Sequence, residues 1–90
     1  METPDEVLTF EVTQDDIDNG RVCSPTFCPI ARAARRHTGK NTSVGTSSLV
    51  TWNNQELYAS YWLPAEARAF IEAFDSGRKP KPFTFTAGRA

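Results

Sequence analysis

The sequence is poor in the residues that metal sites and membrane spans require. It contains one His, two Cys and one Met. It has no run of about 18 apolar residues, and no basic segment followed by an apolar one after Met1. A structural zinc site needs four closely spaced ligands, which Cys23, Cys28 and the distant His37 do not supply. We therefore expect a soluble intracellular chain with no membrane contact, no metal and no cofactor.

The two cysteines are separated by the segment Ser-Pro-Thr-Phe. In a reducing cytosol we expect both Cys23 and Cys28 to be thiols, with Cys28 packed at the start of a helix. A disulfide is the alternative, because the intervening segment can turn tightly. The sequence leaves both states open.

Patterns that signal catalysis are also missing. Cys28 and His37 are nine residues apart on one expected helix, about 13 Å along its axis, so they cannot form a nucleophile and base pair. The acidic residues Asp15, Asp16 and Asp18 have no second cluster to complete a metal site. No phosphate-binding loop or dinucleotide glycine pattern is present. We predict that the chain is not an enzyme and has no catalytic residues.

Neither sign of charge is in excess, since the formal net charge is −1, but the charges are segregated along the chain. Residues 1–20 carry acidic side chains and no basic ones, whereas residues 21–40 carry basic side chains and no acidic ones. In one interpretation the acidic segment docks against the basic helix, or both are simply solvated faces. In the other, the basic residues bind an anionic nucleotide or a nucleic acid; these are Arg32, Arg35, Arg36 and Lys40.

What the chain does contain is enough apolar material for one small core. Its 90 residues are 39% hydrophobic and 11% aromatic, too apolar for a disordered tail. We expect a single α+β domain over residues 1–90, with flexible termini at about 1–6 and 87–90.

Periodicity and end signals predict the local structure. Alternating apolar residues predict strands, and apolar residues three and four apart, with Pro at a helix start and Gly after its end, predict helices. Thr13 and Asp16 have the spacing of a capping box. The expected strands are 7–12, 44–52, 57–63 and 83–86, and the expected helices are 14–19, 29–38 and 64–76. Apart from the one-turn helix 14–19, the order β-α-β-β-α-β matches a ferredoxin-like antiparallel sheet with two helices on one face.

The dipeptide Asn53-Asn54 predicts a two-residue hairpin turn, which fixes the register of the hairpin. In that register Leu49 lies opposite Tyr58. The expected core face carries Val44, Val50, Trp52, Leu57, Ala59, Tyr61 and Leu63. The other face is polar but holds Leu49, Tyr58 and Trp62, and large apolar groups among few charges are typical of an interface centre. We predict that these three residues bind a protein partner.

Four stretches also occur together, in order, over about half of the chain. They are Val12-Thr13-x-x-Asp16-Ile17-Asp18-x-Gly20, Cys28-Pro29-Ile30-Ala31-x-Ala33, Leu63-Pro64-x-Glu66-Ala67-x-x-Phe70-Ile71-x-x-Phe74-Asp75-x-Gly77-Arg78 and Pro82-Phe83-Thr84-Phe85. In this combination the chain resembles small uncharacterised proteins encoded by phages of actinobacteria. It departs from them at Arg32 and Ala34 and in the spacing from Cys23 to Cys28. The resemblance implies an early or accessory phage protein in the host cytoplasm, and it brings no catalytic residues. Together with the apolar face, it leads us to expect binding to a host protein or to a second copy of the chain.

Overall fold

The computed structural model describes residues 6–78 and 80–90, which form one α+β domain of five strands and three helices. The strands are β1 (Val7–Val12), β2 (Asn41–Val44), β3 (Ser48–Asn53), β4 (Glu56–Trp62) and β5 (Phe83–Arg89). The helices are α1 (Gln14–Asn19), α2 (Pro29–Thr38) and α3 (Ala65–Asp75).

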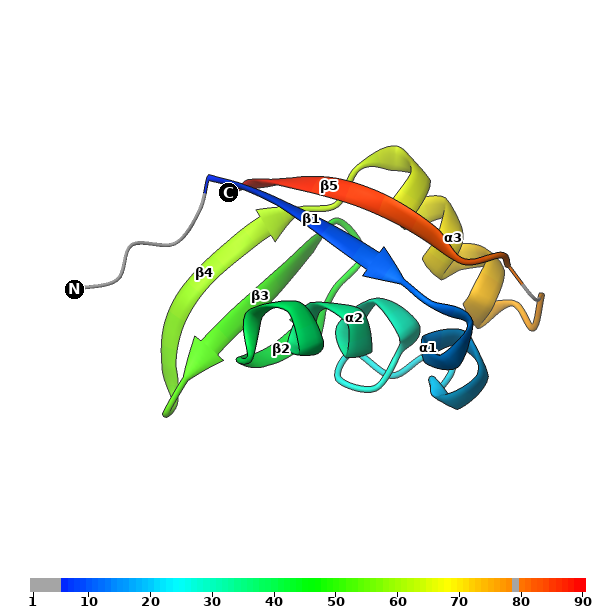
Figure 1. Cartoon of the computed structure of the whole chain (residues 1–90), viewed down its shortest axis with the longest axis horizontal. Helices are drawn as coiled ribbons and strands as arrows, with labels where there is room; N and C mark the ends of the chain where they lie inside the picture. Colours follow the sequence, from blue (N-terminus) through cyan, green and yellow to red (C-terminus); the bar gives the residue numbers. More distant parts are fainter. Residues whose placement is uncertain (1–5, 79) are drawn as a thin grey trace.

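All five strands belong to one antiparallel sheet in the order β1-β5-β4-β3-β2. The first and last strands pair along their whole length, from Val7 opposite Gly88 to Val12 opposite Phe83. By contrast, β4 meets β5 only at Tyr61 and Trp62. The sheet is therefore a β1–β5 ribbon and a β2–β3–β4 meander joined at one corner, and it curls around α2 (Figure 1).

The core fills the inner face of this curled sheet. Helix α2 contacts both edge strands, β1 and β2, and its buried residues include Ile30 and Ala34. Aromatic rings connect the two ends of the core: Phe10 contacts Tyr61 and Phe85, and Phe83 stacks on Phe70 of α3. Small alanines on α2 let the helix approach the strands closely, and the rings fill the remaining space.

The strand order differs from the ferredoxin-like expectation, which is not confirmed. In that plan the first strand lies between the last strand and the third of the four expected strands, whereas here the last strand, β5, lies between β1 and β4, and β1 lies at the edge. The α+β class and the three helices agree with the sequence-based expectation. Local periodicity predicts which segments are strands but carries no information on which distant strands pair.

Two boundary predictions are also corrected. The expected strand 44–52 is two strands, because the chain turns at Gly45, where the Gly45 N–H donates to the Ser48 carbonyl at 2.8 Å. The expected flexible terminus 87–90 is mostly strand, since β5 runs to Arg89 and Ala87 is fully buried. The other expected flexible terminus, residues 1–6, lies outside the described residues except for Glu6.

The ends of α1 and α2 confirm the predicted capping chemistry. Thr13 and Asp16 form a reciprocal capping box on α1, and Cys28 caps α2, whose first residue is Pro29. Between the two helices, Gly20 fits against Pro29 and the Asp16 carbonyl, where an added Cβ would come within 2.7 Å of both.

We therefore expect Gly20→Ala to lower the free energy of unfolding by about 1–3 kcal/mol, because the added methyl overpacks a contact made by backbone and a rigid ring. Urea denaturation followed by circular dichroism measures the loss. Gly88→Ala is the matched control, since nothing lies within 4 Å of a Cβ added there. An equal effect of the two substitutions would contradict the packing argument.

Candidate binding surfaces

The outer face of the sheet, turned away from the helices, carries an uncovered apolar strip. Its members are exposed or partly exposed, and we call them the outer strip: Val7, Val50, Trp52, Leu57 and Trp62. Leu57 is 69% exposed and Trp62 is 58% exposed. Their cross-strand partners are uncharged, for example Ser48 and Gly88 beside Trp62. Large apolar groups without neighbouring charges are the composition of an interface centre.

The structure corrects the predicted membership of this surface. Leu49 is fully buried and lies opposite Tyr61, so it belongs to the core. The turn does move, with Asn54 and Gln55, both at positive φ, as the loop residues in place of Asn53 and Asn54, but this alone would leave Leu49 on the face of Trp62. The reason for the exchange is one extra residue in β4 between the partners of Thr51 and Trp52. A one-residue shift in register exchanges the two faces of a strand.

Tyr58 takes a position of its own between the faces. The register of β3 and β4 shifts between Thr51 and Trp52, so that Thr51 pairs with Ala59 while Trp52 pairs with Leu57. Tyr58 is the extra residue of this bulge. It is half-buried against the core, and the Lys40 ammonium lies 4.2 Å from its ring centroid. Of the predicted interface residues, only Trp62 therefore lies on the exposed apolar surface.

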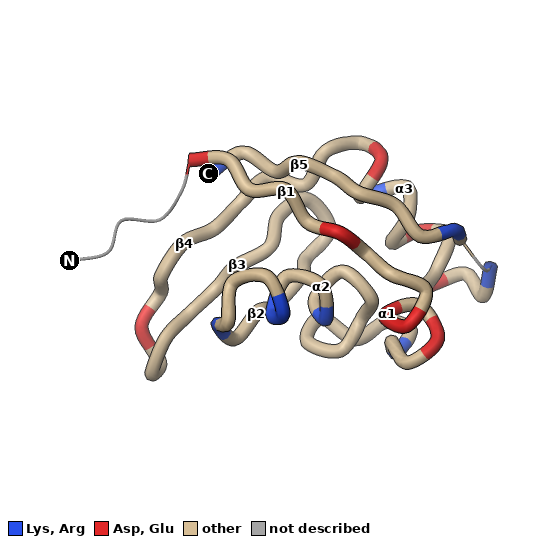
Figure 2. Tube along the Cα trace, viewed as in Figure 1, with Lys and Arg blue, Asp and Glu red and all other residues tan. Residues whose placement is uncertain are grey.

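The predicted basic surface on α2 is tied to the acidic segment. The guanidinium of Arg36 donates two hydrogen bonds to the fully buried Asp16 carboxylate, at 2.7 and 2.8 Å, and one to the Glu11 carbonyl at 2.8 Å. Arg32 pairs with exposed Asp15 at 3.2 Å and lies 3.6 Å from Asp16. The docking interpretation is therefore confirmed for these two arginines, and Figure 2 shows the acidic α1 beside the basic α2.

The electrostatics of this pair follow from its surroundings. Burial alone would raise the pKa of Asp16, but hydrogen bonds from Arg36 and Thr13 together with the Arg36 charge outweigh it, so the pKa lies below its ordinary value. The same partnership raises the pKa of Arg36. Asp16 is thus ionised near neutral pH and holds α1, α2 and β1 together.

The remaining two members of the predicted anion site have other contacts. Arg35 donates to the Thr26 carbonyl and lies over the ring of Phe27, with 5.3 Å from its guanidinium carbon to the ring centroid. Arg21, which the anion-site prediction did not include, lies over the same ring at 5.5 Å. Lys40 lies over Tyr58. Each of the four predicted cations therefore contacts a different group of the chain or shares the Asp16 carboxylate.

The two cysteines are both free thiols. Cys28 is buried and its sulfur accepts a hydrogen bond from the Ala31 N–H at 3.4 Å, which explains its place at the start of α2. Burial raises the pKa of the Cys28 thiol. Cys23 is exposed and its N–H donates to Asp75 at 2.9 Å. A buried thiol with a raised pKa is a poor nucleophile.

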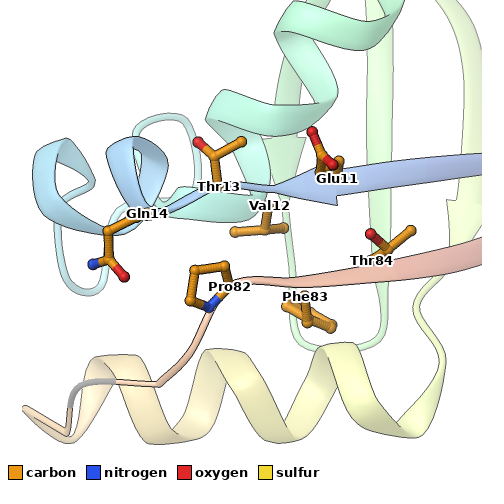
Figure 3. Close-up of a pocket in the computed structure, with 7 residues that line it drawn as sticks. All are labelled: Glu11, Val12, Thr13, Gln14, Pro82, Phe83 and Thr84. Carbon is orange, nitrogen blue, oxygen red and sulfur yellow. The ribbon is translucent and has the colours of Figure 1, made fainter.

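A groove of about 370 Å³ lies where β1 ends and β5 begins. Glu11 and Thr84 line it on the strand side, and Gln14 and Pro82 on the other (Figure 3). Among the described residues that line it, Glu11 is the one with a titratable side chain, so they offer no acid and base pair. Within residues 6–78 and 80–90, no group of three or more His, Cys, Asp and Glu side chains is placed to hold a metal ion.

Comparison of the chain with known proteins identifies no relative. No protein family matches the chain, and neither a curated protein nor a solved structure matches it. In the described part of the chain, no helix has the length and apolar character to cross a membrane.

Proposed function

We propose that this chain is a non-enzymatic binding protein whose outer strip contacts another protein. The observation that supports it most directly is the exposure of Trp62 and Leu57 on a sheet face that no described helix covers. A small folded domain has little reason to expose a Trp among uncharged neighbours unless another molecule covers it. Trp is also the residue most enriched among those that dominate binding energy at interfaces.

The proposed partner is a host protein, with a second copy of the chain as the other candidate. This follows the resemblance to small proteins of actinobacterial phages, which implies an accessory role in host takeover or anti-defence within the host cytoplasm. The outer strip suits such a role because its apolar side chains can be buried against another surface, whereas the open groove beside Glu11 and Pro82 offers no acid and base pair.

Substitution of Trp62 tests the proposal. We expect Trp62→Ala to weaken capture of the partner at least about 30-fold, equivalent to about 2 kcal/mol at an interface centre. Its effect on stability should be small because the side chain is 58% exposed. The measurement is capture of host proteins by the tagged chain, quantified by mass spectrometry, with sedimentation analysis of the chain alone to detect dimers.

Val22→Ala is the matched control, because Val22 is 54% exposed but lies in the loop between α1 and α2. Leu57→Ala is the second test on the outer strip. A captured protein that is retained by Val22→Ala and lost with both outer-strip variants supports the proposal. Equal capture by the native chain and Trp62→Ala would refute it.

A further inference from the structure

Two arginine side chains contact one aromatic ring, that of Phe27, in the loop between α1 and α2. The Arg21 N–H donates to the Phe27 carbonyl at 2.8 Å and closes the loop. Both the Arg21 and Arg35 guanidiniums lie over the Phe27 ring, with 5.5 and 5.3 Å from their central carbons to its centroid. The two cations are therefore no farther apart than the sum of these distances. We call these three side chains the Arg21–Phe27–Arg35 cluster.

The arrangement of this cluster is fixed before any ligand arrives. Arg35 is held by its hydrogen bond to the Thr26 carbonyl as well as by the ring, and it lies one helical turn from Arg32 on α2. Phe27 remains 48% exposed with both guanidiniums in place. A site that is ordered in advance loses little entropy on binding.

The cluster also carries charge that the rest of the molecule does not neutralise. Among the described residues, the ion pairs of this region join Arg32 and Arg36 to Asp15 and Asp16. No carboxylate of the described residues lies within 4.0 Å of the Arg21 or Arg35 guanidinium. A guanidinium without a carboxylate partner is free to pair with an anion, and a ligand that reaches both arginines would make two such charge-assisted contacts.

Guanidinium groups bind phosphate oxygens through paired N–H donors, and exposed aromatic rings stack on nucleobases. We propose that the Arg21–Phe27–Arg35 cluster binds a phosphate ester that carries a planar base, either as a free nucleotide or within a single-stranded nucleic acid. The site shares no residue with the outer strip, so it is a second binding function. Duplex DNA is not its ligand, because a chain with a net charge of −1 lacks the field that duplex binding draws on.

The three probes are oligothymidylate labelled with fluorescein, unlabelled ATP and unlabelled inorganic pyrophosphate. Each probe is titrated into the whole chain at low salt. We expect saturable binding of oligothymidylate or ATP. Replacing Arg21 and Arg35 together by Gln should weaken this binding at least about tenfold. For a single strand, the slope of log affinity against log salt should also fall by about 1.4, because each lost phosphate contact lowers it by about 0.7. Phe27→Ala should weaken the base-carrying probe about tenfold and leave pyrophosphate binding unchanged.

Replacing Arg68 and Arg78 together by Gln is the matched control, because it removes the same charge from the α3 side of the molecule. Circular dichroism checks folding, and Arg21→Gln alone serves if the double variant does not fold. Preference for ATP identifies a nucleotide site and preference for oligothymidylate a nucleic-acid site. Absence of saturable binding by all probes, equal loss in the α3 control, or equal affinity for pyrophosphate and the base-carrying probes would overturn the proposal.

Discussion

Phe10→Ala is expected to remove about 3–5 kcal/mol of the free energy of unfolding, since it deletes a fully buried ring from the centre of the core. That is a large share of the roughly 5–13 kcal/mol that a domain of this size has. The Phe10 ring contacts His37, Tyr61 and Phe85, with centroid distances of 5.4, 6.3 and 5.4 Å. Its removal therefore weakens the contacts of α2, β4 and β5 at once.

Urea denaturation followed by circular dichroism measures this loss. Phe10→Leu keeps most of the apolar volume and should cost about 1–1.5 kcal/mol, so it remains measurable if the alanine variant does not fold. Val7→Ala, on the same strand but 58% exposed, is the control and should change the free energy of unfolding little. An effect of Phe10→Ala no larger than that of Val7→Ala would contradict the described core.

Asp16→Ala has the second largest expected effect, about 3 kcal/mol. It removes the buried partner of Arg36 and one half of the capping box with Thr13. Charge-assisted hydrogen bonds contribute about 1.5–3 kcal/mol and a helix cap about 1 kcal/mol. The total stays moderate because the Arg36 side chain is 50% exposed and regains water when its partner is lost. Asp18→Ala, an exposed neighbour on α1, is the control.

The same residue gives a pH dependence of known sign. The pKa of folded Asp16 is depressed, so its contribution to stability is full above the pKa of the unfolded state, about 3.9. It is lost as the pH falls through the folded pKa. The stability difference between the native chain and Asp16→Asn should therefore be constant near neutral pH and shrink in acid. A difference that grows below pH about 4 would contradict the ion pair.

Features that depend on neighbouring residues were predictable from the sequence. The capping box of Thr13 and Asp16, Pro29 at the first position of α2 and the apolar stripe of α3 are local signals, and each has the structure that its spacing indicates. The docking of the acidic segment on α2 was one of two open interpretations. The sequence alone did not decide it, because Asp15, Asp16 and Asp18 are equally acidic and only the fold buries Asp16.

The outer strip was harder to predict because its membership depends on a single residue of register. The Asn53-Asn54 dipeptide did not fix the turn, whose positive-φ residues are Asn54 and Gln55. The bulge at Tyr58, which no local pattern signals, then exchanges the face of Leu49 relative to β4 and separates Tyr58 from Trp62. Leu49 and Tyr58 were consequently assigned to a surface that holds only Trp62 of the three. Similarly, Arg21 carried no periodic signal that would link it to Arg35.

The pairing of β1 with β5 has a consequence for the order in which the protein forms during synthesis. Phe10 lies opposite Phe85, so the first strand to leave the ribosome has its partner near the end of the chain. At about 5–20 residues per second, the apolar face of β1 is without that partner for roughly 4–15 seconds. The β2–β3–β4 meander can assemble in this interval from neighbouring segments. Of the rings that contact Phe10, His37 of α2 is synthesised first and Tyr61 of β4 second, so we expect α2 to be the first element that covers nascent β1.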